Sequence, residues 1–251
     1  RFLKMHVLYD AKTEKKDLDK RTIDQYVKRL DPSKLYLFGN DVEDIKSKMG
    51  GLSSKIQEGN CRFLDEVQGL LLKRTEQRVK FAKETLAKKD FNVDKKTKLV
   101  LDPDVRKYAA TKAEADAFHK KYLQFQLSNY IATGMKLEEA KETVSKYYDR
   151  LLKRVTETKD DEIYAGFLDS FGRALDPHSN YFSQDAWTDF QISMRLSLDG
   201  IGANLSSQDG FTVIEQLIPG GAAAKSGMLQ PQDKIVAVGQ VEDGQPKEME
   251  N

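Results

Sequence analysis

Glycine is distributed unevenly along this chain of 251 residues, and its distribution constrains the fold more than any other feature of the sequence. Ten of the sixteen glycines lie at or after Gly166, in about the last third of the chain. Because glycine weakens helix interiors but permits tight turns and close backbone contacts, the architecture is expected to change there. The sequence therefore predicts an α+β protein, in which a mainly helical amino-terminal part is followed by a small β-rich module.

The composition narrows the classes of function. Lys and Arg number 41 and Asp and Glu number 40, so the formal net charge of +1 gives no overall basic surplus for binding nucleic acid. The mean hydropathy is −0.62, and no apolar run approaches the length of a membrane span. A single cysteine, Cys61, excludes an internal disulfide and a cysteine zinc site. The chain starts at Arg1 without a leader segment, so we expect a signal peptide to have been removed.

Before the glycine-rich part, apolar side chains recur every three or four residues, which is typical of helices that bury one face. The first helix is expected to end at Asp31, because the following proline disfavours helical geometry in the residue before it. Asn40 or Asp41 is expected to cap the second helix, and Thr111 with Glu114 fits a capping box. The predicted helices cover residues 22–30, 40–49, 61–86, 111–134, 137–155, 160–175 and 183–190, and a charged connector covers 88–104.

The aromatic and leucine stripes of these helices are interpreted as core positions and not as a cofactor site. Their Lys and Arg faces are interpreted as solvated surface and not as a track for nucleic acid. Trp187 and Phe190 lie one helical turn apart and are also expected in the core, with a hinge-facing or peptide-facing position as the alternative. The Asp102–Asp104 segment is expected to be a turn that starts a helix.

The pattern changes after Leu198, where small and apolar residues alternate and turn signals become frequent. The sequence Gln-Asp-Gly at 208–210 predicts a hairpin turn. The expected elements are strands over 200–205 and 211–217, a break at 219–221, a helical turn over 222–225 closed by Gly227, and a strand over 234–238 ended by Gly239.

Several motifs carry a family resemblance. Gly-Ile-Gly-Ala at 200–203, the Pro-Gly-Gly run at 219–227 and Asp-Lys-Ile-Val-Ala-Val-Gly at 233–239 together resemble a PDZ domain of the variant found in bacterial processing proteases. Leu-Asp-Pro-His-Ser-Asn-Tyr-Phe at 175–182 resembles the segment that precedes the PDZ domain in carboxyl-terminal processing proteases. The stretch 196–203 is similar to the tail-specific protease branch of that family. The resemblance therefore extends to the helical part.

Within that helical part, Leu-Asp-Pro-Ser at 30–33 resembles a motif near the start of the family's amino-terminal domain. The resemblance implies a helical amino-terminal domain over residues 1–195 and the amino-terminal part of a PDZ domain over residues 196–251. It stops before the second PDZ helix, so the β-rich module is expected to be incomplete. A serine protease domain is expected after residue 251.

A PDZ domain binds an extended peptide by adding it as a strand to a sheet edge, and backbone N–H groups of a glycine loop bind its terminal carboxylate. In the resemblance, the side chain of Ile201 also lines the pocket for an apolar terminal residue. The alternative is that Gly-Ile-Gly is only a tight start to a strand. The resemblance implies that the carboxylate is bound by the loop residues Gly200, Ile201, Gly202 and Ala203. It also implies that Asn204 and Leu205 begin the strand that pairs with the peptide.

No catalytic residue is assigned to this chain. It contains neither a Gly-x-Ser-x-Gly nor a Ser-x-x-Lys motif. In the family, a serine nucleophile is activated by a lysine general base, and both residues lie in the domain that follows the PDZ module. The three histidines, His6, His119 and His178, have no metal-ligand spacing, so neither a metal nor another cofactor is predicted.

The resemblance implies the substrate-recognition part of a periplasmic tail-specific serine endopeptidase. Its partners would be the apolar carboxyl termini of substrate proteins, and a lipoprotein adaptor is a candidate partner for the helical part. The alternative is a non-catalytic PDZ adaptor or scaffold that binds carboxyl-terminal peptides. A third hypothesis, a structural helical domain with an inactive β module, predicts no preference for a free carboxylate.

Overall fold

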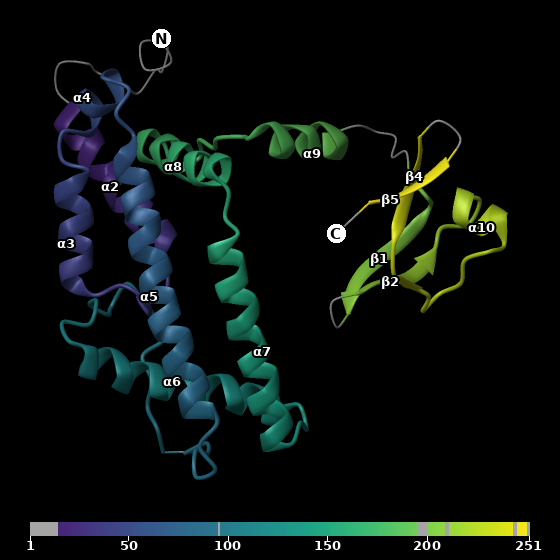
Figure 1. Cartoon of the computed structure of the whole chain (residues 1–251), viewed down its shortest axis with the longest axis horizontal. Helices are drawn as coiled ribbons and strands as arrows, with labels where there is room; N and C mark the ends of the chain where they lie inside the picture. Colours follow the sequence, from purple (N-terminus) through teal and green to yellow (C-terminus); the bar gives the residue numbers. More distant parts are fainter. Residues whose placement is uncertain (1–14, 95, 195–199, 209–210, 243–244, 250–251) are drawn as a thin grey trace. The chain divides into compact units, whose positions relative to one another are not determined.

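The computed structural model describes residues 15–94, 96–194, 200–208, 211–242 and 245–249 and confirms the predicted α+β class. The chain divides into two compact units, Arg1–Ser183 and Gln184–Asn251. In the first unit the helices are α2 (Lys15–Leu30), α3 (Gly39–Lys48), α4 (Leu52–Gln57), α5 (Arg62–Leu86), α6 (Lys112–Ala132), α7 (Leu137–Thr156) and α8 (Asp160–Leu175) (Figure 1). Helix α4 was not predicted. Among these described residues no helix has both the length and the apolar character that a membrane crossing requires.

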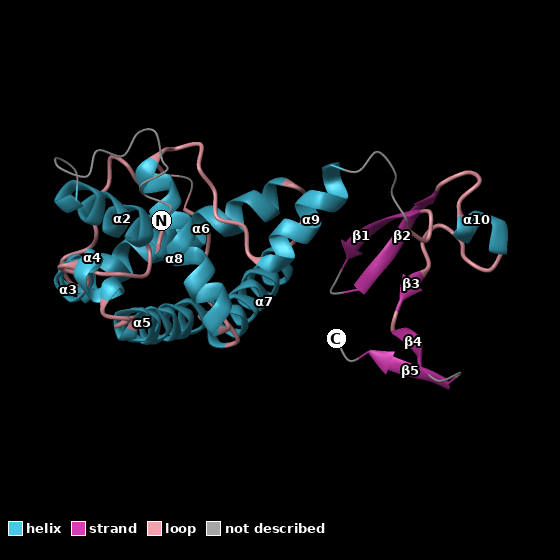
Figure 2. Ribbon diagram, turned by 90° about the horizontal axis from the view of Figure 1, so that it is seen from above, coloured by secondary structure: helices cyan, strands magenta, loops and turns pink. Residues whose placement is uncertain are grey.

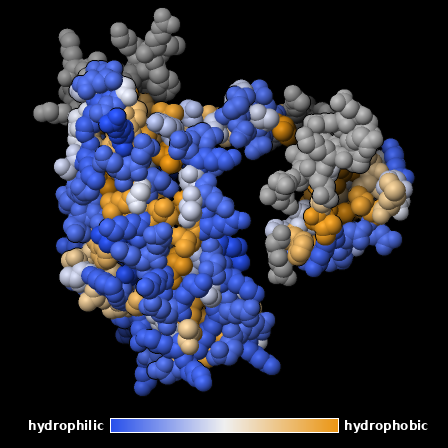
Figure 3. All heavy atoms as spheres, viewed as in Figure 1, coloured by the Kyte–Doolittle hydropathy of each residue, from blue (hydrophilic) through white to orange (hydrophobic). Residues whose placement is uncertain are grey.

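Helix α5 joins the two apolar cores of the helical unit. Its first half contributes Phe63 and Val67 to a core shared with α2, α3, α4 and α8. Its second half contributes Val79 and Leu86 to a core shared with α6 and α7. Half-buried apolar side chains that pack against these cores reach the surface as a stripe between α5 and α7, within an otherwise polar face (Figure 3).

Two carboxylates fix the turn between α2 and α3. Asp31, directly after α2, accepts hydrogen bonds from the backbone N–H groups of three consecutive residues, each at 2.9 Å (Leu35, Tyr36 and Leu37). The predicted cap of α3 was wrong, because Phe38 and not Asn40 or Asp41 is the N-cap residue. Asp41 lies three residues into the turn, where its carboxylate reaches back to the Phe38 N–H at 2.9 Å. The Asp41 side chain therefore caps the amino-terminal end of α3 from within the first turn of the helix.

The start of α6 differs by one residue from the predicted capping box. The Thr111 hydroxyl accepts a hydrogen bond from the Glu114 N–H at 3.2 Å, as expected. The Glu114 carboxylate, however, accepts from the N–H of Ala110 at 2.9 Å and not from that of Thr111. The Asp102–Asp104 segment does not start a helix. It forms a turn in which the Asp104 N–H donates to the Asp102 side chain at 2.8 Å.

Several predicted core positions lie outside the core. On α7 and α8, Tyr147 and Leu168 are exposed, whereas the polar Lys141 and Ser170 are buried. Gly166 of α8 is buried because it packs on α2, where an added Cβ would lie 2.8 Å from the Arg29 Nε.

The two buried polar side chains have hydrogen-bond partners that the sequence does not reveal. Helical periodicity predicts which face of a helix is buried, but it does not show whether a lysine or a serine on that face can form a hydrogen bond. Lys141 finds a partner in the Lys88 carbonyl, at 3.1 Å, and Ser170 in the Gly166 carbonyl, at 2.9 Å.

Helix α6 buries a histidine where the sequence suggested an aromatic stripe. Its buried face contains His119, Leu123 and Leu127, while Phe118 and Tyr122 are only half-buried. A histidine is tolerated there because its ring is hydrogen-bonded and packs against aromatic neighbours.

His119 belongs to a buried hydrogen-bond chain. Its Nε2 lies 2.8 Å from the Tyr148 hydroxyl, which donates onward to the side-chain amide oxygen Oε1 of Gln126 at 3.1 Å. Because the tyrosine proton is used in that second bond, Nε2 carries the histidine proton and donates it. Burial, followed by the nearby Arg78 cation, lowers the pKa of His119 to about 3. The ring is therefore neutral in the folded protein at neutral pH.

This neutral histidine makes stability fall in acid. The pKa of His119 is about 3 when folded and about 6.5 when unfolded, so the unfolded chain binds more protons below pH 6.5. Above pH 6.5 the titration of His119 does not reduce the free energy of unfolding, and the reduction grows as the pH falls from 6.5 toward 3. At about pH 5 the free energy of unfolding is lower by about 2 kcal/mol.

Urea unfolding followed by helical circular dichroism at about pH 5 and pH 7 measures this loss. The His119→Gln variant should lose most of the dependence near pH 6, whereas the matched His178→Gln variant, at an exposed position, should keep it. Equal pH dependence in the wild type and in His119→Gln would contradict the assignment.

The second unit contains helix α9 (Gln184–Met194) and two small sheets (Figure 2). Trp187 and Phe190 of α9 stack on each other with ring centroids 5.6 Å apart. They are 43% and 38% exposed, so the expectation that they are core residues was wrong. The helix also runs past Phe190, where the sequence had placed its end.

The larger sheet is antiparallel in the order β1-β2-β3. Its strands are β1 (Ala203–Gln208), β2 (Phe211–Leu217) and β3 (Lys234–Ile235), and helix α10 (Ala222–Ser226) follows β2. The predicted strand 234–238 was wrong in extent, because β3 ends at Ile235. Gly239 does not end a strand but pairs with Glu248 inside a hairpin of β4 (Val238–Glu242) and β5 (Gln245–Met249).

Candidate functional site

The loop before β1 is bound to the rest of the β-rich unit by two backbone hydrogen bonds. The Ile201 carbonyl accepts from the N–H of Ala223 in α10 at 2.7 Å. The Gly202 carbonyl accepts from the N–H of Ile218, directly after β2, at 2.9 Å. These two bonds fix the orientation of two successive peptide units, 201–202 and 202–203.

That orientation turns two N–H groups outward. In a planar trans peptide the C=O and N–H groups point in opposite directions. The carbonyls of Ile201 and Gly202 point toward Ala223 and Ile218, so the N–H groups of Gly202 and Ala203 point away from them. Two adjacent donors on one side of a loop form a concave site for an anion.

The loop packs directly on the backbone at the start of α10. Gly202 has φ +75°, and a Cβ added there would lie 2.8 Å from the Cα of Gly221. A Cβ added to Gly221 would lie 2.9 Å from the Cα of Gly202. Only glycine on both sides permits this approach. The contact holds the loop close enough for its carbonyl to reach Ala223.

Strand β1 lies at the edge of the three-stranded sheet. It pairs with β2 and, among the residues that the structure describes, with no strand on its other side. The pairing has a bulge between Asn204 and Leu205, which lie opposite Gln216 and Ile214. An outer strand of this kind can accept an extended peptide by strand addition.

The structure brings all six sequence-assigned residues together, in the loop and at the start of β1. Ile201 and Leu205 are each 46% exposed, so their side chains are available to a ligand. Three residues that position the loop were not predicted from the sequence: Ile218, Gly221 and Ala223. Their signal was the Pro-Gly-Gly-Ala-Ala run, which was interpreted as a break, a helical turn and part of the PDZ resemblance but was given no role in positioning the loop.

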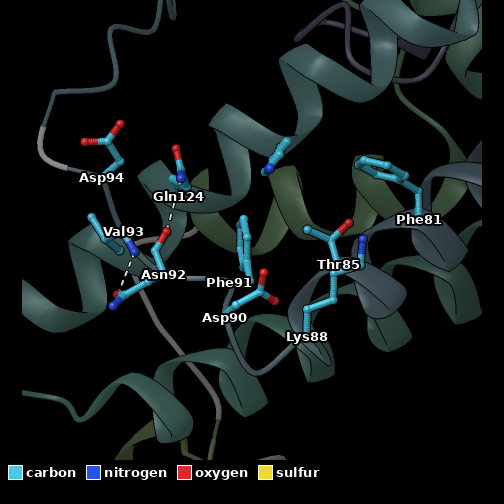
Figure 4. Close-up of a pocket in the computed structure, with 10 residues that line it drawn as sticks. Phe81, Thr85, Lys88, Asp90, Phe91, Asn92, Val93, Asp94 and Gln124 are labelled. Carbon is cyan, nitrogen blue, oxygen red and sulfur yellow. Dashed lines mark hydrogen bonds between the residues drawn. The ribbon is translucent and has the colours of Figure 1, made fainter.

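The helical unit has a pocket of a different kind. It has a volume of about 430 Å³ between the end of α5, the following loop and α6 (Figure 4). Gln124 of α6 donates to the Asn92 carbonyl at 3.1 Å and so holds the loop against the helix. The lining consists of Phe81, Thr85, Lys88, Asp90, Phe91, Asn92, Val93, Asp94, Lys120 and Gln124. It has no serine, cysteine or histidine, and its lining carries both positive and negative charges.

Metal ligands do not gather in the described part of the chain. No group of three or more His, Cys, Asp or Glu side chains there has the arrangement of a metal site. The candidate site is therefore the glycine loop together with the free edge of β1.

Comparisons with known proteins match the two units separately. The model of the tail-specific protease N-terminal domain matches residues 2–185, and the PDZ domain model matches residues 189–246. The tail-specific protease of Haemophilus influenzae is 29% identical over 225 residues, which make up 89% of this chain and 32% of that protein. The carboxy-terminal processing protease CtpA of Bacillus subtilis is 33% identical over 105 residues, 41% of this chain and 21% of that protein. The chain thus spans at most about a third of these relatives, and the matches confirm the resemblance seen in the sequence.

Replacing Gly202 tests the backbone contact. In Gly202→Ala, the new Cβ meets Gly221 at 2.8 Å and the residue must keep a positive φ, so we expect the β-rich unit to lose about 1–3 kcal/mol of stability. Gly200→Ala is the matched control, because a Cβ there meets nothing within 4 Å. Amide hydrogen exchange in β2 should accelerate only in Gly202→Ala. Equal protection in the two variants would show that the contact contributes nothing.

Proposed function

The chain belongs to the tail-specific protease family, and on that premise we propose that it is the substrate-recognition part of a tail-specific serine endopeptidase. The observation that carries the proposal is the pair of outward N–H groups in the loop, next to a free strand edge. A peptide carboxyl terminus needs both features, since its carboxylate takes donors and its extended backbone takes a strand partner.

In the proposal, the terminal carboxylate binds the N–H groups of the Gly200–Ala203 loop. Hydrogen bonds to an ionised acceptor are about twice as strong as neutral ones, so the charged end dominates recognition. The side chain of Ile201 contacts the apolar terminal residue of the substrate. Asn204 and Leu205 begin the antiparallel pairing with the peptide backbone.

Cleavage takes place outside these 251 residues. A serine nucleophile attacks the peptide carbonyl, and a neutral lysine accepts the serine proton, which requires burial to lower the pKa of that lysine. Relatives named as proteases support a peptidase as the parent protein. We further propose that the enzyme is bacterial, as both relatives are, and periplasmic, with a lipoprotein adaptor as a candidate partner of its helical unit.

Amidation of the peptide tests recognition of the carboxylate. A peptide with a free apolar carboxyl terminus should bind the parent protein at least about tenfold more tightly than its amide, because the amide removes the anionic acceptor. Isothermal titration calorimetry with the two peptides measures the ratio. Equal affinities would refute recognition by the loop, whatever the catalytic activity of the protein.

A side-chain test uses two isoleucines with nearly the same exposure. Ile201 is 46% and Ile218 is 47% exposed, but only Ile201 is assigned to the peptide pocket. Ile201→Ala should weaken binding of the free-acid peptide roughly threefold to tenfold through lost apolar contact. Ile218→Ala should leave the affinity within about twofold of the wild type. Equal losses in both variants would remove Ile201 from the pocket.

The catalytic part of the proposal has its own test. The native polypeptide should cleave a protein with a free apolar carboxyl terminus, and replacing one serine and one lysine outside this chain should each abolish cleavage. Peptide binding without cleavage by the native protein would favour the non-catalytic adaptor.

A further inference from the structure

Positive charge is concentrated in one stretch of the helical unit. Residues 73–136 contain sixteen Lys and Arg against eight Asp and Glu, a surplus of eight positive charges. The other residues contain 25 Lys and Arg against 32 Asp and Glu, a deficit of seven. The near-neutral whole therefore conceals a basic segment, which comprises the second half of α5, the loop after it and α6.

A pocket of about 340 Å³ lies in this basic segment. Its walls include two phenylalanine rings, Phe38 and Phe81, and its lining carries four cations and one carboxylate. The cations are Arg74, Arg78, Lys80 and Lys112, and the carboxylate is Glu84. The volume is at the lower end of the range found for small-molecule sites.

Arg74 is a fixed wall of the pocket. Its guanidinium makes a two-pronged contact with Asp41, with both N···O distances 2.8 Å, and a third bond to Gln77. The Cζ of Arg74 also lies 4.4 Å from the centre of the Phe38 ring. These contacts neutralise Arg74 and hold the ring in place without filling the pocket.

Arg78 is different, because it is buried and its one ion pair is poorly aligned. Only 1% of the residue is exposed. Its Nη1 lies 2.7 Å from the Asp116 Oδ1, yet neither atom makes an aligned hydrogen bond to any described residue. Its Cζ lies 5.4 Å from the centre of the Phe81 ring. A desolvated guanidinium is most favourable where acceptors meet all of its donors, and a single shared carboxylate does not do so.

We propose that this pocket binds a small anion that carries carboxylate or phosphate groups. The anion accepts hydrogen bonds from the Arg78 guanidinium, and Lys80 at the rim adds a further positive charge. Asp116 pairs with only one nitrogen of this guanidinium and is shared with Lys112, so other donors of Arg78 stay available to the anion. Planar guanidinium groups bind carboxylates and phosphates with the same fork geometry, so both anions share one recognition chemistry.

Two variants on one helix provide the test. Lys80 lines the pocket, whereas Lys73 is also exposed on α5 but does not line it. Lys80→Gln and Lys73→Gln therefore remove the same charge inside and outside the proposed site. Amide chemical shifts of the isotope-labelled chain are followed during titration with inorganic phosphate and, separately, with citrate, at constant ionic strength.

At least one anion should cause saturable shifts at the amides around Phe38, Arg78 and Phe81. Lys80→Gln should raise the dissociation constant roughly threefold or more, and Lys73→Gln should leave it within about twofold. Saturation with phosphate alone or with citrate alone identifies the preferred anion. Shifts that stay linear up to tens of millimolar, or equal effects of the two variants, would overturn the proposal and show only ionic screening.

Discussion

The approach of two glycine backbones, at Gly202 and Gly221, is the constraint on which the candidate site depends. Without a Cβ on either residue, the loop before β1 lies directly against the start of α10. This proximity allows Ala223 to bond the Ile201 carbonyl and aligns the Gly202 carbonyl with Ile218. Since a peptide unit is rigid, fixing two carbonyls on the inside fixes two N–H groups on the outside. The directions of the two N–H groups thus depend on the absence of a side chain at Gly202 and Gly221 and not on any side chain that is present.

Buried carboxylates have a comparable role in the helical unit, but a similar sequence does not guarantee a similar structure. The segments at 30–38 and 175–182 both contain Leu-Asp-Pro. In the first, Asp31 accepts three consecutive backbone N–H groups. In the second, Asp176 accepts one N–H at 3.2 Å, and a later amide of the segment bonds Asp169 of α8 instead. The similarity therefore reflects two helix-ending turns that are stabilised differently.

Much of the fold could be predicted from the sequence because helical periodicity is a local signal. The helix predicted over 61–86 differs from α5 by one residue. The errors arose where tertiary partners decide. His119 is buried because Tyr148 bonds it, and Lys141 because the Lys88 carbonyl does. At the candidate site, the order of the motifs along the sequence predicted the position of the loop. The contact between Gly202 and Gly221, however, joins residues nineteen positions apart and cannot be recognised from the neighbouring sequence of either.

Recognition by backbone N–H groups has a consequence for specificity in the proposed function. Such donors recognise the terminal carboxylate and the direction of the substrate backbone, and neither of these depends on the side chains of the substrate. With one apolar contact from Ile201, the loop discriminates among terminal residues by only the free energy of burying a small apolar surface. Many chains end in an apolar residue, so affinity for the terminus cannot by itself select a substrate. Selection must then depend on whether the terminus is exposed and extended, as it is in an unfolded or unpaired protein.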